Sequence, residues 1–355
     1  MELSQAFEFV QRQTRNTIER YPGLHPMYTT GGKWDVSGEK WTHWCEGFYP
    51  GIMWLLHEQT GDAWWRGQAE AYSRRLEPRQ HDRDVHDLGF IFLSTYLPWH
   101  RATGDGRLND VLIQAGRTLA LRFQPCGRYL CSFLGRESLF IDIMMNVGII
   151  FYAAQQTRDR QLRDVAMNHC HTTRRYLVRG DGSTSHEGIF DTNTGEFLRQ
   201  TTRQGHRNDS CWSRGLAWAL YGFGTSYGYS GEQKFLHTAN ACADFYLEHT
   251  PEGGVPYWDY DVPEGPDRIY DSSAAAIAAA GLFRLDRPRE ARKIVQTLCG
   301  RFLTADAYRP PSERQGLDGL LAEGVYHFHK KLAVSESVAW GDYFFTEALI
   351  RALEA

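Results

Sequence analysis

The feature that most constrains the fold of this chain is an internal repeat of apolar segments rich in small residues. Each segment begins at a polar or charged residue, continues through small and apolar side chains, and in most cases ends at a Gly-Asp-like turn. Apolar residues on every side of a helix are typical of a buried helix. The repeated segments are 46–62, 87–105, 142–159, 214–232, 271–286 and 342–354.

Amphipathic stretches with many arginines follow the first five of these segments. In the stretch 232–249, Phe235, Ala239, Cys242 and Phe245 recur at intervals of three and four residues, which predicts a helix with one apolar face. Residues 1–20 can supply one more helix of this kind. The sequence therefore predicts buried helices that alternate with half-exposed helices; the other amphipathic stretches are 63–77, 107–123, 160–178 and 287–303.

Six helix pairs indicate an all-α fold, a closed (α/α)6 barrel with an inner and an outer ring. An open solenoid is the alternative, but it usually needs polar capping repeats. No stretch rich in Pro, Gly or Ser divides the chain, so we expect residues 1–355 to form a single catalytic domain. The irregular stretches precede the inner helices on one rim, where sites are usually built; they are 22–45, 79–86, 124–140, 179–213, 250–270 and 304–339.

The charge and hydropathy patterns argue against several classes of partner. The net charge is −4 with acids and bases interleaved, so no nucleic-acid-binding stripe is expected. The most apolar stretch, 141–154, is too short and mixed for a membrane span. The start of the chain, MELSQAFEFVQRQ, lacks the pattern of a secretory signal, which favours a cytoplasmic location. The oligomeric state is not predictable from these patterns.

The cysteines and histidines do not indicate a metal or a cofactor. The 7 cysteines are scattered without a CxxC motif, which favours reduced thiols over a disulfide framework or a zinc site. Two histidine pairs, His169 with His171 and His327 with His329, have a spacing that places them on different faces of a helix, and no third ligand is nearby. We therefore expect neither a metal nor another cofactor.

Charged residues stand at the start of most predicted inner helices, so a barrel would bring them together at one mouth. Any of them can be a simple helix cap. Asp87 follows the polar segment HDRDVH, which predicts a wet rim, whereas Asp142 lies within LFIDIMMN, where an isolated charge is costly and a raised pKa is expected. Paired carboxylates with separated pKa values are typical of glycosidic bond cleavage. The set comprises Asp87, Asp142, Arg214, Asp271 and Asp342.

Aromatic residues are abundant, with 11 Trp, 18 Tyr and 19 Phe. Such rings fill a large core or stack on sugar faces in a cleft. Arg214 can grip a carboxylate with two hydrogen bonds. The polar and aromatic candidates near the predicted mouth are His186, Gln204, His206, Ser210, Trp212, Trp218, Trp41 and Trp44; solvated loop histidines and core tryptophans are the alternative interpretations.

Five motifs in this chain together resemble glycoside hydrolase family 88, the unsaturated glucuronyl hydrolases. They occur in the family's order and extend over nearly the whole chain, and the family's fold is an (α/α)6 barrel. The motifs are HDLGF at 86–90, DIMMN at 142–146, SCWSRGLAW at 210–218, DSSAAAIAA at 271–279 and SVAWGDYFF at 337–345.

The resemblance implies a particular reaction. Enzymes of this family act on oligosaccharides left by polysaccharide lyases, whose non-reducing end is a 4,5-unsaturated uronic acid. They hydrate the vinyl ether double bond, and the hemiketal then collapses and releases the sugar as a keto acid. By this resemblance Asp142 is the general acid and base, and Asp87 assists and contacts the sugar.

The resemblance also implies which residues bind the sugar. Family positions that line the sugar site match His186, Gln204, Trp212, Arg214, Trp218 and Trp44. Ser210 belongs to the same loop motif, Phe133 is the nearest ring where the family often has Trp, and Lys330 supplies a positive charge near the C-terminus. Leu216 replaces the Gln that the family usually has in its RGQAW motif.

Three other functions remain open on the sequence. One is a related unsaturated rhamnogalacturonyl-type hydrolase, with the same chemistry and a rhamnose as the neighbouring sugar. Another is a helical toroid that binds sugars without catalysis, which Leu216 favours. A sugar epimerase on the same barrel would be expected to use histidines at inner-helix ends, where this chain has aspartates.

Overall fold

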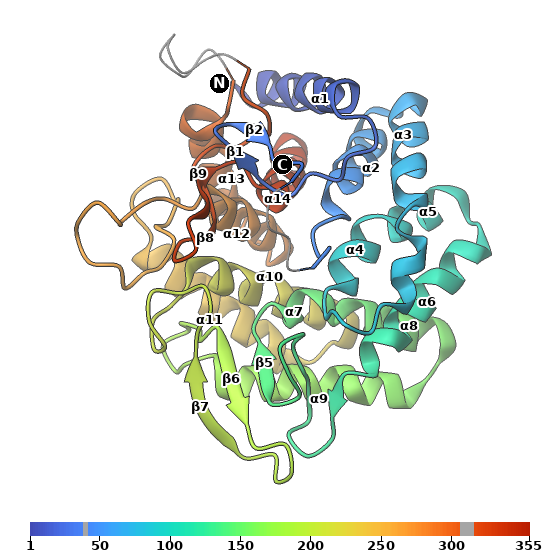
Figure 1. Cartoon of the computed structure of the whole chain (residues 1–355), viewed down its shortest axis with the longest axis vertical. Helices are drawn as coiled ribbons and strands as arrows, with labels where there is room; N and C mark the ends of the chain where they lie inside the picture. Colours follow the sequence, from blue (N-terminus) through green and yellow to red (C-terminus); the bar gives the residue numbers. More distant parts are fainter. Residues whose placement is uncertain (38–41, 306–315) are drawn as a thin grey trace.

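The helices of the chain form two rings, one inside the other (Figure 1). The computed structural model describes residues 1–37, 42–305 and 316–355. The inner ring consists of α2 (Phe48–Thr60), α4 (Leu88–Ser94) with α5 (Tyr96–Thr103), α7 (Ile143–Asn146) with α8 (Gly148–Thr157), α10 (Ser213–Ser230), α12 (Ser272–Arg284) and α14 (Ala339–Glu354). The outer ring consists of α1 (Leu3–Arg20), α3 (Ala63–Arg74), α6 (Gly106–Ala120), α9 (Arg160–Leu177), α11 (Gln233–His249) and α13 (Pro288–Thr297).

The inner ring closes on itself. Helices that follow one another in this ring pack side by side, and the last, α14, packs against the first, α2. The predicted helix pairs and the (α/α)6 barrel are thereby confirmed. Two short elements add to the outer layer, a 3₁₀ turn at Glu77–His81 and a π-helical turn at Leu298–Phe302 after α13.

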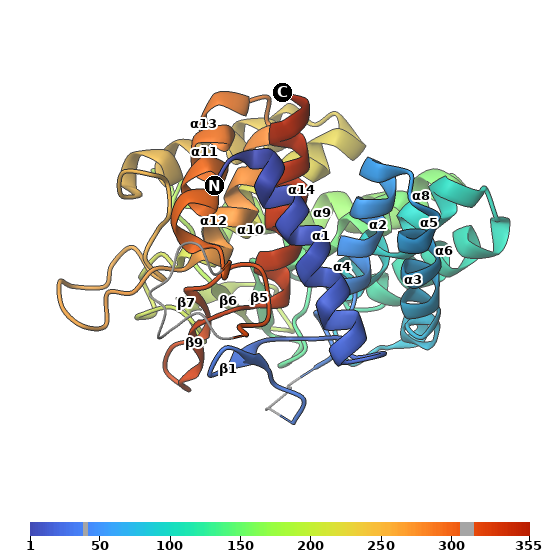
Figure 2. The same cartoon turned by 90° about the horizontal axis from the view of Figure 1, so that it is seen from above.

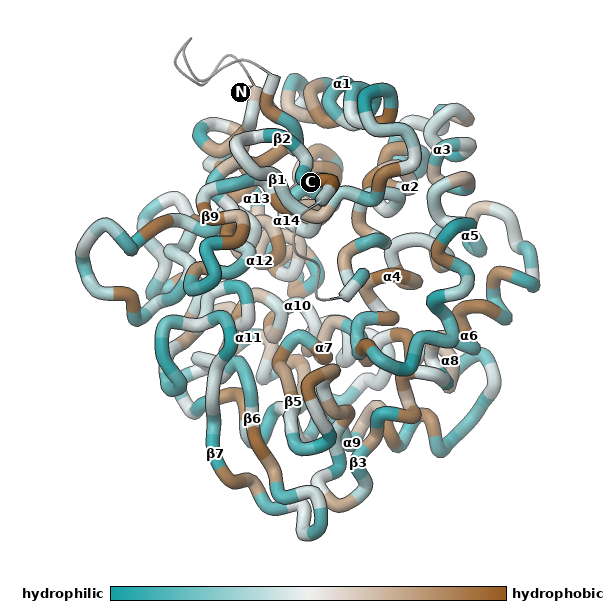
Figure 3. The backbone as a smooth tube through the Cα atoms, in the orientation of Figure 1, coloured by the Kyte–Doolittle hydropathy of each residue, from teal (hydrophilic) through white to brown (hydrophobic). Residues whose placement is uncertain are grey.

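Burial follows the two sequence patterns. The alanine-rich helix α12 is buried over almost its whole length, because its small side chains allow α10 and α14 to approach from both sides. The outer helix α13 buries only Ala291, Ile294 and Val295, which lie on one face. Along the backbone, hydrophobic residues gather in central helices such as α4 and α7, while the peripheral loops are mostly hydrophilic (Figure 3).

Two inner helices are divided, α4 from α5 and α7 from α8, and the sequence analysis predicted neither break. The break between α4 and α5 lies close to Pro98. Pro98 cannot donate a backbone hydrogen bond to the preceding turn. At the break, Ser94 Oγ donates to Phe90 O at 2.6 Å and Thr95 Oγ1 donates to Ile91 O at 2.5 Å. These back-bonds satisfy the carbonyls while the helix changes direction between α4 and α5.

The predicted irregular stretches contain short strands, which the sequence analysis missed. Most of these strands lie together at one end of the helical rings (Figure 2). The three-stranded antiparallel sheet β5-β6-β7 is the most important for the site, because β5 leads directly to Asp142. The strands are β1 (Thr29–Thr30), β2 (Lys33–Trp34), β3 (Phe123–Gln124), β4 (Tyr129–Leu130), β5 (Ser138–Phe140), β6 (Glu187–Phe190), β7 (Phe197–Thr201), β8 (Gly324–His327) and β9 (Leu332–Glu336). Among the described residues, no helix has both the length and the apolar character that a membrane span requires.

Candidate active site

A pocket of about 560 Å³ opens where the inner helices α4, α7 and α10 begin. This volume lies in the usual range for small-molecule sites. Both candidate catalytic aspartates line it, and so do seven of the nine predicted substrate-binding residues. The predicted residues in its wall are Trp44, Asp87, Phe133, Asp142, Gln204, Trp212, Arg214, Trp218 and Lys330.

Asp87 precedes the first residue of α4, but its side chain does not cap the helix by a hydrogen bond. The prediction that it faces a wet rim is wrong, because the residue is only 5% exposed. Burial, and next the nearby negative charge of Asp142, raise the pKa of Asp87 well above its ordinary value. The fold buries this position although its neighbours in sequence are polar.

Asp142 precedes α7 and likewise makes no side-chain capping bond. Burial raises the pKa of Asp142 to about 7; the charge of Arg214 opposes this shift and that of Glu187 adds to it. The raised pKa agrees with the expectation from its apolar neighbours in sequence. A carboxyl group of this pKa is present both as acid and as base near neutral pH.

A buried histidine lies beside each aspartate. His86 Nε2 is 3.4 Å from Asp87 Oδ1, and His186 Nε2 is 3.8 Å from Asp142 Oδ1. Backbone amides of Phe133 (3.0 Å) and of Arg203 (3.1 Å) donate to the Nδ1 atoms of His86 and His186, respectively. Since Nδ1 accepts, we assign the hydrogen to Nε2, which faces the carboxylate.

Both histidines are neutral in this arrangement, and the distance of 3.8 Å from His186 Nε2 to Asp142 Oδ1 is too long for a hydrogen bond. Burial lowers the pKa of His186 to about 3, and it also lowers the pKa of His86 well below the ordinary value. His186 was predicted to bind the substrate, but it is not among the residues that line the pocket. It lies behind Asp142 with its Nε2 facing that carboxylate, at a position directly before β6 where His186 O accepts from Ile141 N at 3.0 Å.

Arg214 lines the pocket while its guanidinium group is held by the protein. Nη2 donates to Gln204 Oε1 at 2.6 Å and to Tyr326 O at 2.9 Å. Nη1 donates to Asp271 Oδ2 at 3.3 Å and to Val325 O. All four Nη hydrogens thus have partners, so the predicted two-bond grip on a carboxylate would have to displace one of them. The positive charge of Arg214 still acts on the pocket, where it favours the ionised form of Asp142.

Aromatic rings form the apolar wall of the pocket. Trp44 packs against Phe90 with ring centroids 5.5 Å apart, and Phe90 packs against Trp218 at 5.0 Å. Phe133 stacks on the His86 ring at 5.5 Å. Large flat faces of this kind suit the apolar face of a sugar ring. Trp41, the other tryptophan that the sequence singles out here, is outside the described residues.

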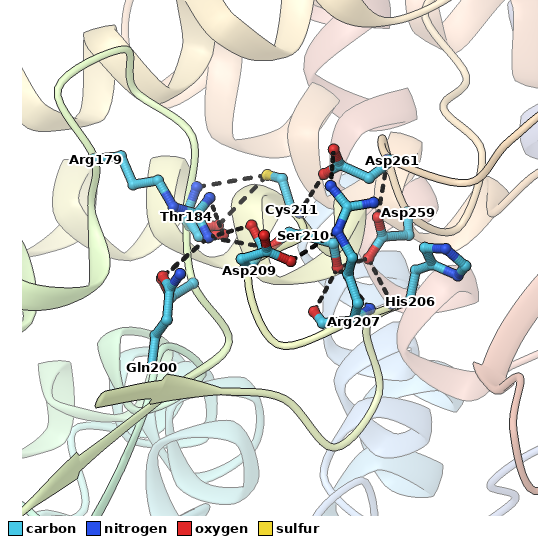
Figure 4. Close-up of polar contacts among 11 residues, drawn as sticks. Arg179, Thr184, Gln200, His206, Arg207, Asp209, Ser210, Cys211, Asp259 and Asp261 are labelled. Carbon is cyan, nitrogen blue, oxygen red and sulfur yellow. Dashed lines mark hydrogen bonds and ion pairs between the residues drawn. The ribbon is translucent and has the colours of Figure 1, made fainter. Parts of the chain in front are cut away.

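Ser210 does not line the pocket, in contrast to its predicted role. Its Oγ donates to Asp259 Oδ2 at 2.7 Å, and the His206 amide donates to the same oxygen at 2.8 Å (Figure 4). Arg179 donates to the carbonyl oxygens of Asp209 (2.9 Å) and Ser210 (3.2 Å). This network fixes the loop that carries Gln204 and Trp212 into the pocket wall.

The other charged residues at inner-helix starts have structural contacts. Asp271 caps α12, accepting from Ser273 N at 3.1 Å, and pairs with Arg214. Asp342 accepts from the amides of Leu320 (2.9 Å) and Leu321 (3.0 Å). Leu216, where the family usually has Gln, is fully buried and does not line the pocket, so its substitution alters the core rather than the cavity surface.

Several pocket residues were not among the predicted site residues. His86 and Arg203 are direct neighbours of residues that were predicted, so closeness in sequence could have indicated them. Leu134 likewise follows Phe133, and Phe90 belongs to the same HDLGF motif as Asp87. The others come from segments whose meeting the sequence does not reveal. The full set comprises Thr42, His86, Phe90, Leu134, Phe140, Arg203, Tyr326 and His327.

Comparisons with known proteins agree with this geometry. Residues 10–248 match the model of Glycosyl Hydrolase Family 88. The unsaturated glucuronyl hydrolase of Bacillus sp. (strain GL1) is 33% identical over 95% of this chain and 93% of its own length, and its crystal structure superposes with a TM-score of 0.89 over 99% and 96% of the two chains.

Two further relatives carry other substrate names. The unsaturated chondroitin disaccharide hydrolase of Streptococcus pyogenes serotype M1 is 29% identical over 99% of this chain and 91% of its own length. An unsaturated glucuronyl hydrolase specific for heparin is 28% identical, with a TM-score of 0.90 over 99% of this chain and 97% of that chain. From the matched family model and the extent of these similarities, the chain belongs to glycosyl hydrolase family 88.

Proposed function

We propose that this glycoside hydrolase removes a 4,5-unsaturated uronic acid from the non-reducing end of lyase-generated oligosaccharides by hydrating its vinyl ether double bond. The observation that carries the proposal is the pair Asp87 and Asp142 in one aromatic pocket, with the pKa of Asp142 raised to about 7. The activities named for the similar enzymes, on unsaturated glucuronyl and chondroitin substrates, support the same reaction here.

In the proposed reaction Asp142 acts first as an acid. It gives its proton to the alkene carbon C4, and a water oxygen then bonds to C5 and yields a proton to the Asp142 carboxylate. The resulting hemiketal opens by breaking the C5–O5 bond, which leaves a ketone at C5 and a hemiacetal at C1. The hemiacetal then breaks its bond to the neighbouring sugar, which leaves as the alcohol, and the uronic acid remains as an open-chain keto acid with an aldehyde at C1. A carboxyl group with a pKa near 7 suits both proton transfers at neutral pH.

Asp87 and the surrounding residues would hold the sugar for this step. Asp87, kept protonated by its raised pKa, can donate to a sugar hydroxyl or to the incoming water. Trp44, Phe133, Trp212 and Trp218 would pack on the ring faces. The remaining proposed substrate contacts are Gln204, Arg214 and Lys330 in the pocket wall; His186 and Ser210 would support them from behind.

We extend the proposal to the whole chain and to its location. Residues 1–355 would act as one catalytic domain, because the pocket takes residues from Thr42 to Lys330. A cytoplasmic location is proposed on the state of the cysteines, all of which are free thiols, six of them buried.

The test is to incubate the protein with lyase-generated unsaturated disaccharides and follow the ultraviolet absorbance of the double bond. We expect the absorbance to fall for at least one glucuronyl substrate. The panel should include sulfated and unsulfated chondroitin, heparin and rhamnose-linked disaccharides, because the relatives differ in their named substrates.

The control is the same disaccharide with a saturated uronic acid. Hydration cannot act on it, so it should remain intact, whereas cleavage of the saturated disaccharide would indicate an ordinary glycosidase that attacks the anomeric carbon. Sugar binding without any absorbance loss over the whole panel would contradict the proposal and favour a non-catalytic toroid.

A further inference from the structure

Glu187, the first residue of β6, is a fully buried carboxylate outside the pocket wall. Its Oε1 accepts from Ser138 Oγ at 2.6 Å, and its Oε2 pairs with Arg203 Nε at 3.1 Å. Burial of a charge is costly even when the charge is paired, and a hydrophobic side chain in the same place is often at least as stable. Stability alone therefore does not account for a charged residue at this position.

The strand register places Glu187 beside the chain that enters Asp142. Strands β5 and β6 are antiparallel, and Phe140 lies opposite Glu187. The pairing continues one residue further, since Ile141 N donates to His186 O at 3.0 Å, and Asp142 follows directly. Ser138 binds Glu187 from the same strand that leads to Asp142. The sheet thus fixes the glutamate and the aspartate relative to each other.

We propose that Glu187 is a positioning residue whose fixed, buried negative charge keeps the carboxyl group of Asp142 in its proton-carrying form for the reaction. The proposal rests on the role of Asp142 as proton donor. It adds a residue that never touches the substrate, and it explains why a glutamate rather than an apolar residue follows His186 in a buried strand.

The charges around Asp142 are consistent with this role. Arg214 from α10 favours the ionised form of Asp142 and Glu187 from β6 opposes it. His186, which directly precedes β6, is neutral, and Asp87 from the start of α4 interacts with Asp142 while its own pKa is raised well above the ordinary value. Without Glu187, the charge of Arg214 would act on Asp142 with less opposition.

Arg203 does not cancel the effect of Glu187 on Asp142. The Arg203 side chain is 56% exposed, so water screens its charge, while the Glu187 side chain has no exposure. The field between Glu187 and Asp142 runs through protein, where charges interact more strongly than in water. The net influence on Asp142 is therefore negative.

The experiment compares wild type with Glu187→Gln, which keeps the shape and removes the charge. The pKa of Asp142 is followed by carbon-13 NMR of labelled aspartate, and kcat/KM is followed against pH. We expect the pKa of Asp142, and with it the alkaline limb of the kcat/KM profile, to move down by about half to one pH unit. Above that limb, kcat/KM of the variant should be about 3- to 10-fold lower than that of wild type. Below the limb the rate should be nearly unchanged, and Glu187→Asp should restore most of the wild-type profile.

Glu347→Gln is the matched control. Glu347 is also a buried glutamate that accepts from a hydroxyl, Tyr221 Oη at 3.1 Å, and pairs with an arginine, Arg284 at 3.3 Å, but it lies in α14 and does not line the pocket. This variant should lose stability without any shift of the pH profile. An unshifted pKa of Asp142 in Glu187→Gln, or an equal loss of rate at every pH, would overturn the proposal.

A measurement on wild type keeps the proposal testable if Glu187→Gln does not fold. Carbon-13 NMR of labelled glutamate should show Glu187 as a carboxylate over the whole range in which Asp142 titrates. A Glu187 that is protonated in this range would overturn the proposal. These NMR readouts need no substrate, so absence of turnover in wild type would contradict only the proposed function.

Discussion

Asp87 and Asp142 occupy helix starts without using their side chains as caps, and this sets them apart from Asp271. All three immediately precede a helix, but only the Asp271 carboxylate accepts a hydrogen bond from a backbone amide of its helix, that of Ser273 at 3.1 Å. Burial therefore acts on Asp87 and Asp142 without a compensating capping bond, and their pKa values rise. Carboxyl groups left protonated in this way are suited to proton donation.

The first prediction at this scale concerns pH. Because Asp142 must carry its proton to begin the reaction and its pKa is about 7, kcat/KM should fall about tenfold per pH unit well above pH 7. The check is a pH profile of kcat/KM on an unsaturated disaccharide, with folding verified at each pH by circular dichroism. A profile that stays flat up to pH 9 would exclude Asp142 as the acid.

The second prediction concerns stability. The pKa of Asp142 is higher in the folded chain than the ordinary 3.8, so folding favours its protonated form. The loss of folding stability caused by ionising Asp142 is absent below about pH 4, grows as the pH rises, and is complete above about pH 7. The free energy of unfolding of Asp142→Asn, relative to that of wild type, should therefore increase as the pH rises between these limits. The increase is up to a few kcal/mol, at about 1.4 kcal/mol per pKa unit. Chemical denaturation at pH 4.5 and pH 8 tests this, and a difference that is equal at both pH values would contradict it.

At the scale of elements, the two aspartates depend on how α4 and α7 meet. Asn146, the last residue of the DIMMN motif, accepts from Phe90 N at 2.8 Å and donates to Asp142 O at 3.3 Å. Gly89 lies so close to this point that a Cβ atom on it would be 2.4 Å from Asn146 Cα. The glycine allows the close approach and the asparagine ties the helices together.

Gly89→Ala should therefore disturb both stability and activity. The added methyl group meets backbone rather than a flexible side chain, so α4 and α7 must separate, at a cost of about 1–3 kcal/mol. We expect kcat to fall at least tenfold because Asp87 and Asp142 move apart. The matched control is Gly67→Ala in α3, where nothing lies within 4 Å of the new Cβ; it should stabilise the chain by about 0.5–1 kcal/mol with unchanged kcat. Similar effects of the two substitutions would argue against this packing.

The helices could be predicted from sequence because their signals are local. The predicted segment 160–178 corresponds to α9 (Arg160–Leu177), and 214–232 corresponds to α10 (Ser213–Ser230). Strands β5 to β7 were missed because each is only three to five residues long within a loop. Their register is set by tertiary pairing rather than by a pattern along the chain.

Site residues on helices were easier to predict than those on loops. The positions of Asp142 and Arg214 follow from helix starts, which converge in a barrel. His186 and Ser210 lie in loops, and their backbone contacts turn them behind the wall rather than into the pocket. Tyr326 and His327 come from β8, more than 100 residues from Arg214 in sequence, so only the closed fold brings them to the pocket.

At the scale of the whole molecule, the barrel is closed by contacts between the two ends of the chain. Asp318 accepts from Arg20 Nη1 at 2.5 Å, from Tyr21 Oη at 2.8 Å and from Trp34 N at 3.0 Å. Glu336 accepts from Thr29 Oγ1 at 2.6 Å. These bonds hold the N-terminal segment against the loop before β8 and against β9, and β8 between them carries Tyr326 and His327 of the pocket wall.

Asp318→Ala should therefore weaken the contacts that close the barrel and leave the catalytic step nearly unchanged. It leaves the Trp34 amide and the Tyr21 hydroxyl without their partner, so we expect a loss of about 2–4 kcal/mol in the free energy of unfolding. Hydrogen exchange should rise first in α1 and near Trp34, while kcat of the folded enzyme stays within about twofold. Glu8→Ala, on the exposed face of α1, is the control and should change neither. Unchanged exchange in Asp318→Ala would show that closure does not depend on this carboxylate.

The most direct test of the central claim is the rate of ultraviolet absorbance loss from an unsaturated disaccharide, measured for wild type and Asp142→Asn at the same pH. An amide cannot deliver the proton, so the rate should fall by about 10³-fold or more while the variant remains folded and still binds the disaccharide. If Asp142→Asn retains a rate within about tenfold of wild type, another group supplies the proton, and the role assigned to Asp142 is wrong.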